Sequence, residues 1–260
     1  MLEFCSVQDQ DGVWLVTIER PERLNALHPD ANFELATVFD AFLEDTDARV
    51  AIITGSGDRA FCVGHDLHHL NTGTTHRVPE TGFAGLTHCF RRTKPVIAAV
   101  NGLALGAGFE IALACDLVIA ADDAEFALPE PRYGLAASMG GLHRLPRQIG
   151  LKEAMGLILT GRRIDAREAQ RLGLVNELVP RADVVPAALR WARQILECSP
   201  GAIAASMEIV WRGLEEASTE LAVTADYTAT RVLQQNPDAT EGPRAFVERR
   251  RPVWSGRSGG

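Results

Sequence analysis

Two short, predominantly apolar runs constrain the fold of this chain more than any other feature. They are VAIITG (50–55) and PVIAAV (95–100), and a glycine-bearing turn follows each. A strand that is apolar on both faces is typical of a buried parallel sheet. After the second run, a helical segment, FEIALAC (109–115), leads to a further apolar strand, DLVIAA (116–121). This alternation of strands and helices predicts an α/β fold.

The pattern becomes helical toward the end of the sequence. One more strand is expected at LVNELV (174–179), and from residue 182 onward almost every segment has helical periodicity. An apolar stripe with no neighbouring strand recurs there at steps of three and four, formed by Ile203, Met207, Val210 and Leu214. We therefore expect a core domain over residues 1–195 and a helical oligomerisation module over residues 196–260.

The composition narrows the possible partners. The chain has 260 residues, 46% of them hydrophobic, and a net charge of -8. This charge argues against nucleic acid as a partner, because phosphate binding depends on clustered Lys and Arg. The apolar stretch over residues 95–121 is interrupted by Asn101, Glu110 and Asp116, so we expect no membrane span. The five cysteines form no CxxC pair and the first residues are polar, which favours a cytoplasmic protein.

Two motifs that could suggest a bound metal or nucleotide are weak. His65, His68, His69 and His76 lie close together, but neither HExxH nor a Cys/His zinc spacing accompanies them, and we predict no metal. GAGFEI lacks the third glycine of a dinucleotide-binding loop, which argues against NAD. The Gly, Thr and Pro of residues 71–85 predict a mobile surface loop.

Two glutamates stand next to glycine-bearing turns. Glu110 is the only charge in NGLALGAGFEIALAC (101–115), and an unpartnered buried carboxylate is costly unless it caps a helix or does chemistry. Glu130 follows a strand-like run in FALPEPRYGL (126–135). Alone, the first would serve a helix terminus and the second a salt bridge. Together they match water addition to a double bond, in which one carboxylate deprotonates water and another protonates the neighbouring carbon.

The sequence also predicts backbone donors for an oxyanion. AFCVGHDL (60–67) and NGLALGAGFE (101–110) are glycine turns after predicted strands, where N–H groups can face a ligand instead of a strand. A helix that begins near Ala107 would add its positive end. Such fixed donors stabilise a developing enolate oxygen. Asp66 and Asp116 are expected to cap a helix or tie a loop to the core.

These segments resemble the enoyl-CoA hydratase/isomerase family, the crotonase superfamily. The motifs AFCVGHDL, NGLALGAGFEIALACDLVIAA, FALPE and GGLHRLPR occur in the family's order, between ERPERLNAL near the start and EGPRAFVERRRP near the end. The resemblance implies a spiral of ββα units with a C-terminal helical trimerisation module, assembled as homotrimers or dimers of trimers. It implies an acyl-CoA thioester as substrate and no cofactor, because coenzyme A enters as part of the substrate.

The resemblance also assigns roles to individual residues. The backbone N–H groups of His65 and Ala107 are similar to the family's oxyanion hole, and Glu110 and Glu130 fall on the positions of the two hydratase glutamates. The substrate-binding positions implied in this way are Arg23, Ala26, Gly64, Asp66, Leu67, Gly106, Pro129, Ser138, Phe246 and Arg249. Two departures bear on substrate preference: His65 stands where a small residue is common, and AASMGG (136–141) replaces a PGAGG turn.

The pair of glutamates favours reversible syn addition of water to 2-enoyl-CoA thioesters. Three alternatives stay open at this point. A carnitinyl-CoA dehydratase would use the same two glutamates, and a Δ3,Δ2-enoyl-CoA isomerase would depend on fewer of them. A non-catalytic CoA- or RNA-binding relative would keep the fold alone, although the acidic balance argues against RNA.

Overall fold

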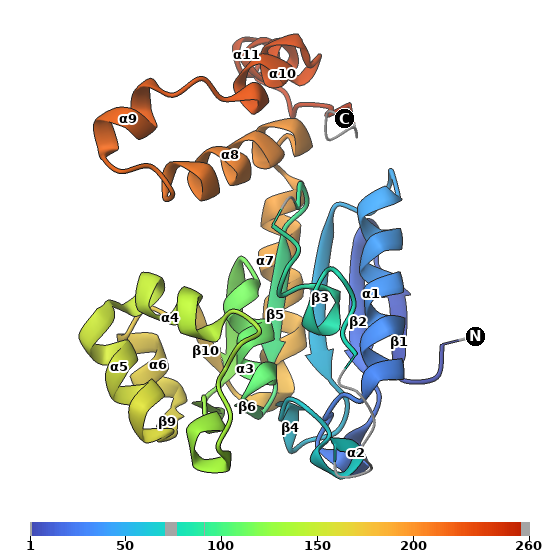
Figure 1. Cartoon of the computed structure of the whole chain (residues 1–260). Helices are drawn as coiled ribbons and strands as arrows, with labels where there is room; N and C mark the ends of the chain where they lie inside the picture. Colours follow the sequence, from blue (N-terminus) through green and yellow to red (C-terminus); the bar gives the residue numbers. More distant parts are fainter. Residues whose placement is uncertain (1, 71–76, 91, 256–260) are drawn as a thin grey trace.

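The computed structural model describes residues 2–70, 77–90 and 92–255 and contains two sheets (Figure 1). In the larger sheet, β1 is antiparallel to β2 and every other neighbouring pair is parallel. Its strands in spatial order are β1 (Cys5–Asp9), β2 (Val13–Ile18), β3 (Val50–Gly55), β5 (Val96–Val100), β7 (Leu117–Ala121) and β10 (Glu177–Val179). The smaller sheet is formed by β4 (Ala60–Cys62), β6 (Leu103–Leu105), β8 (Glu125–Ala127) and β9 (Ile164–Asp165), the last of which is antiparallel.

The chain passes from the larger sheet to the smaller one three times in succession. β3 leads to β4, β5 to β6, and β7 to β8, and each pair is followed by a helical segment. These segments are α2 (Leu67–Leu70), α3 (Ala107–Ala114) and the 3-10 turn η3 (Glu130–Tyr133). The predicted spiral of ββα units is confirmed. Both apolar runs are buried strands at the middle of the larger sheet, where Ile52 lies opposite Ile97.

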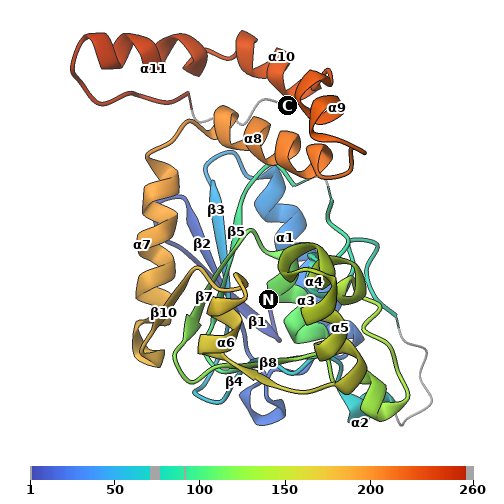
Figure 2. The same cartoon turned by 90° about the vertical axis from the view of Figure 1, so that its left-hand side faces the viewer.

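Helices cover both faces of the larger sheet. Figure 2 shows α7 (Val184–Leu196) on one side of the sheet and α1 (Pro29–Glu44) and α3 on the other. The smaller sheet contacts α6 (Ala166–Arg171), while α4 (Gly141–Ile149) packs on α3 and α5 (Leu151–Thr160) packs on α4 and η3. Three further 3-10 turns are η1 (Pro21–Arg23), η2 (Phe83–Gly85) and η4 (Arg181–Asp183), and of these η2 is buried. None of the helices in the described ranges is both long and apolar enough to cross a bilayer.

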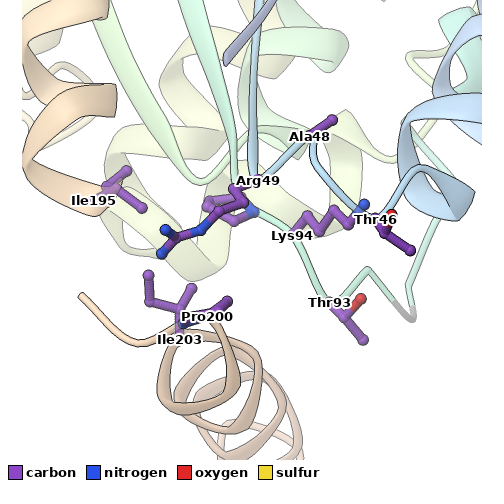
Figure 3. A pocket seen from close by; sticks show the side chains of 9 residues that line it. Thr46, Ala48, Arg49, Thr93, Lys94, Ile195, Pro200 and Ile203 are labelled. Atoms are coloured by element: carbon purple, nitrogen blue, oxygen red, sulfur yellow. The ribbon is translucent and has the colours of Figure 1, made fainter. Parts of the chain in front are cut away.

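The last four helices form a separate layer beyond the end of α7 (Figure 1). They are α8 (Pro200–Gly213), α9 (Thr219–Thr224), α10 (Thr228–Gln235) and α11 (Asp238–Val247). Ser199 caps α8 by accepting from the Ala202 N–H, and its hydroxyl donates to Asp238 at 2.6 Å. Figure 3 shows the joint with the core, where a cavity of about 10 Å³ has room for about one water between Arg49, Lys94 and Ile203.

The prediction of a surface loop over residues 71–85 is wrong for the C-terminal part of that segment. Residues 71–76 lie outside the described residues, but Phe83 and Ala84 are fully buried in η2. The Ala84 N–H donates to Asn32 on α1, and the Phe83 N–H donates to the Thr87 hydroxyl. The segment's composition is typical of a loop, but its apolar residues pack beneath α1, and two glycines with positive φ allow the tight turn.

Candidate active site

The first turn of α3 meets the turn that follows β4. The helix begins at Ala107, so the N–H of that residue has no partner within the helix. A Cβ atom at Gly64 would lie 2.9 Å from the Ala107 nitrogen, and one at Gly108 would collide with the Cys62 carbonyl oxygen. Both glycines are therefore required for this close approach. The approach brings the peptide groups of residues 64–65 against the positive end of α3.

The backbone at His65 is oriented by a short bridge to Leu27. The Leu27 N–H donates to the Gly64 carbonyl at 2.8 Å, and the Asp66 N–H donates to the Leu27 carbonyl at 3.1 Å. Because successive N–H groups of an extended chain point to opposite sides, the N–H of His65 points away from Leu27. The imidazole of His65 packs edge-on against Phe83, with ring centroids 4.5 Å apart.

Glu110 lies in the first turn of α3 and is 1% exposed. Its Oε1 accepts the N–H of Gly141, the first residue of α4, at 2.7 Å. A Cβ atom at Gly141 would lie 3.0 Å from this oxygen, so a glycine at residue 141 eases the close approach of α4 to the carboxyl group. One oxygen of Glu110 is thereby fixed by the backbone of another helix.

Glu130 begins the 3-10 turn after β8 and faces the same end of α3. A Cβ atom at Gly106 would lie 2.9 Å from Glu130 Oε1, so the bare glycine leaves room for this carboxyl group. Its Oε2 is buried and has no hydrogen-bond partner within residues 2–70, 77–90 and 92–255. A buried acceptor without a partner is uncommon in folded proteins. It is suited to a ligand or a water that brings a donor.

Burial changes the acidity of both carboxyl groups. It raises the pKa of Glu110 to about 7, with a smaller rise from the charge of Glu130 and an opposing effect of the Gly141 N–H. Burial also raises the pKa of Glu130 above its ordinary value. A carboxyl group with a pKa near neutrality can both accept and release a proton at physiological pH, which is the property required of an acid–base catalyst.

A larger cavity, of about 240 Å³, lies on another side of α3. Its lining includes Phe109, Phe126, Asp116 and Gln148, and neither glutamate. Asp116 is paired with Arg92, and the Gln148 amide donates to a backbone carbonyl. Asp116 and Gln148 are therefore engaged with other parts of the protein, and we place the candidate site at the two glutamates, where a buried acceptor is left open.

Comparison with known proteins identifies the family of this chain. The family model for enoyl-CoA hydratase/isomerase matches residues 8–257. The chain belongs to the enoyl-CoA hydratase/isomerase family. It is 43% identical over 268 aligned positions to a carnitinyl-CoA dehydratase of Escherichia coli (strain K12), covering 99% of this chain and 100% of the relative.

Solved structures give the same family. A probable enoyl-CoA hydratase/isomerase from Mycobacterium abscessus superposes with a TM-score of 0.90 at 37% identity, and 99% of this chain and 100% of that chain are covered. A carnitinyl-CoA hydratase from Mycobacterium avium superposes with a TM-score of 0.79 at 40% identity and the same coverage. The crotonase fold and its C-terminal helices are thus shared by this family member.

Most of the predicted site residues of this enoyl-CoA hydratase/isomerase family member lie together. Gly64, Gly106 and the two glutamates surround the start of α3, and Pro129 directly precedes Glu130. Ala26 and Asp66 are buried beside the bridge to Leu27. The side chains of three other predicted residues are exposed around this region, namely Arg23, Leu67 and Ser138.

Phe246 and Arg249 lie elsewhere in the chain. Both are exposed at the end of α11, and both views show α11 at the opposite end of the molecule from α2 (Figures 1 and 2). The structure of one chain therefore does not bring them to the glutamates. A role for them in substrate binding stays a prediction that requires a second copy.

The sequence analysis missed two residues of the site. It assigned no role to Gly141, although the glycine pair of GGLHRLPR (140–147) marks a backbone that other groups can approach closely. It also overlooked Arg20, which lies 46 positions from its partner Asp66.

Among the described residues no three His, Cys, Asp or Glu side chains gather as a metal site would require, and His76 lies outside them. Cys62 packs as a buried thiol, as expected.

Proposed function

We propose that this chain catalyses the reversible syn addition of water to 2-enoyl-CoA thioesters. The observation that carries the proposal is the placement of two carboxyl groups at one helix start, one with a pKa near 7 and one with an unpartnered buried oxygen. The relatives support it, since those named above are called enoyl-CoA hydratase/isomerase, carnitinyl-CoA dehydratase or carnitinyl-CoA hydratase.

In the proposed mechanism the thioester oxygen accepts hydrogen bonds from the N–H groups of His65 and Ala107. Electron density drawn to that oxygen makes the β-carbon electrophilic, and the positive end of α3 stabilises the enolate that forms. Glu110 takes a proton from a water molecule, whose oxygen bonds to the β-carbon. Glu130 gives a proton to the α-carbon, and proton exchange between the carboxyl groups and solvent restores the site. The two carboxyl groups share protons, so their roles are those of a coupled pair.

The proposal extends to the substrate and the assembly. We assign the nucleotide part of coenzyme A to the turn that holds Arg23 and Ala26, and to Phe246 and Arg249 of another copy. This requires an oligomer, which we propose to be a homotrimer or a dimer of trimers. The core domain would be residues 1–195 and the oligomerisation module residues 196–260. No cofactor takes part in the chemistry proposed.

We also propose a cytoplasmic location. It rests on the cysteines of the sequence, all five of which carry free thiols in the structure. Proteins of oxidising compartments more often pair their cysteines in disulfides.

A second candidate is dehydration of carnitinyl-CoA. It is favoured by the 43% identity with the dehydratase of E. coli across 99% of this chain. The same pair of carboxyl groups would remove the α-proton and protonate the leaving hydroxyl group. Only the acyl group distinguishes the two candidates, so substrate testing separates them.

The first experiment follows the absorbance of the conjugated enoyl thioester. Crotonyl-CoA, longer 2-enoyl-CoAs and crotonobetainyl-CoA are offered to the wild type, Glu110→Gln, Glu130→Gln and the control Glu153→Gln. Glu153 is an exposed glutamate on α5. We expect both site variants to lose about 10²- to 10⁴-fold in kcat, as removal of an acid–base group does, and the control to keep its rate. Activity that survives Glu130→Gln would instead favour an isomerase.

A further inference from the structure

A buried ion pair lies behind the turn that carries the proposed first oxyanion donor. Arg20 Nη2 donates to Asp66 Oδ2 at 3.0 Å, and the two side chains are only 11% and 7% exposed. Asp66 follows His65 directly in the chain. Its other oxygen accepts the N–H of His68 at 3.1 Å, so the carboxylate also caps the start of α2. No step of the proposed mechanism uses this pair.

The guanidinium of Arg20 joins two turns that are far apart in sequence. Its Nη1 donates to the carbonyl of Ala26, while its Nη2 binds Asp66. The backbone N–H of Arg20 also donates to the side chain of Asn25 at 3.0 Å. The planar fork of arginine suits such double binding, because its donors keep a fixed geometry. Arg20 therefore holds the turn over residues 20–27 against the turn over residues 64–66.

This clamp supports a backbone bridge that involves the peptide group of the His65 N–H itself and the peptide group that follows it. The bridge to Leu27 uses the Gly64 carbonyl and the Asp66 N–H, at 2.8 Å and 3.1 Å. Leu27 is held by its own turn, and Asp66 is held by Arg20. If the fork is lost, the turn over residues 64–66 loses its side-chain tie to the turn over residues 20–27, and the Asp66 carboxylate keeps its contact with the start of α2.

We propose that Arg20 and Asp66 are positioning residues that fix the direction of the first oxyanion donor. The inference rests on the proposed function, because it assigns the His65 N–H to the thioester oxygen. Neither side chain touches the reacting atoms. Fixed donors stabilise a transition state because they need no reorientation during the reaction, and small misplacements in an active site can cost about 100-fold in rate.

The chain contains a matched ion pair at the other end of α3. Arg92 Nη2 binds Asp116 at 2.9 Å, its Nη1 donates to the carbonyl of Ala114, and Asp116 also accepts the N–H of Val96. The side chains are 6% and 15% exposed. This pair has the same chemistry and similar burial, but it contacts the last turn of α3 instead of the first. It therefore controls for the loss of a buried ion pair as such.

The experiment compares Arg20→Gln and Asp66→Asn with Arg92→Gln and Asp116→Asn. We measure kcat on the enoyl-CoA that the wild type hydrates best, the urea unfolding midpoint, and the absorption maximum of bound cinnamoyl-CoA. The conjugated carbonyl of that probe absorbs at longer wavelength when its oxygen accepts strong hydrogen bonds. Arg20→Lys and Arg92→Lys are added because they keep the charge and disturb folding less.

We expect both pairs to lose stability to a similar extent, because each substitution breaks a buried ion pair. Only the variants of Arg20 and Asp66 should lose about 10- to 100-fold in kcat and reduce the red shift of cinnamoyl-CoA. The kcat of Arg20→Lys should lie between those of Arg20→Gln and the wild type. The kcat of Arg92→Lys should match that of the wild type within about threefold. An unchanged red shift, or equal losses of kcat in both pairs, would overturn the positioning role.

The proposed function and the positioning role fail in different ways. A wild type that hydrates none of the thioesters offered would reject the proposed function. A wild type that hydrates them, with Arg20 variants that behave as the Arg92 variants do, would reject the positioning role alone.

Discussion

At the scale of single residues, the burial of Glu110 links stability to chemistry. Its pKa of about 7 in the folded chain lies well above the 4.5 of a solvated glutamate, and burial is the main cause. A carboxyl group of this kind destabilises the folded state as the pH rises from the unfolded pKa to the folded one, because the fold disfavours its charged form. Above about pH 7 the penalty is constant.

Glu110→Gln should therefore be more stable than the wild type at neutral pH. Gln keeps an oxygen that can accept the Gly141 N–H but has no charge to bury. The difference in pKa corresponds to about 3 kcal/mol, which we expect to develop between pH 4.5 and pH 7. Urea unfolding of both proteins from pH 5 to pH 8 measures it.

The control is Glu168→Gln, whose difference in stability from the wild type should not change over this pH range. A hydrogen bond from Arg162 lowers the pKa of Glu168, so the stabilisation by that carboxylate is lost only as the pH falls through its lowered pKa. The difference between this variant and the wild type should stay constant from pH 5 to pH 8. A Glu110→Gln difference that is equally constant would show that Glu110 is not the buried acid described here.

At the scale of elements, the sequence predicted the helices and strands whose formation depends on a local residue pattern. The strands β3 and β5 follow from uninterrupted apolar runs, and the start of α3 near Ala107 follows from the glycines before it. Contacts between distant segments were not predictable, because periodicity reports only which face of a segment is apolar. The Gly141 N–H on Glu110, 31 positions away, and the buried η2 turn are of this second kind.

Gly108 and Gly156 test the packing of α3 because both lie inside helices. A Cβ at position 108 would collide with the Cys62 carbonyl oxygen, whereas one at position 156 on α5 meets nothing within 4 Å. We expect Gly108→Ala to lose about 1–3 kcal/mol of unfolding free energy by overpacking, and to lose activity because α3 moves. Gly156→Ala should gain about 0.5–1 kcal/mol from helix propensity. Urea unfolding and kcat of both variants measure these effects. Equal stability of the two variants would contradict the close approach of α3 to β4.

At the scale of the whole molecule, the C-terminal helices expose several large apolar side chains. On α8, at its C-terminal end and on α9 these are Val210, Trp211, Leu214, Leu221 and Val223. Where such side chains adjoin one another, they are typical of a protein interface. The exposed apolar face is therefore available to another copy of the chain.

The double variant Leu214→Glu and Val223→Glu should dissociate the proposed trimer, because both side chains are more than 70% exposed in one chain and a buried charge at an interface is costly. Sedimentation velocity measures the change in mass. The control is Leu2→Glu, because Leu2 is an exposed leucine before β1.

If Phe246 and Arg249 of another copy hold the coenzyme A nucleotide, KM for crotonyl-CoA should rise in the dissociated protein. KM for crotonyl-pantetheine, which lacks the nucleotide, should not change. A monomeric variant with unaltered KM for crotonyl-CoA would place the nucleotide site within one chain.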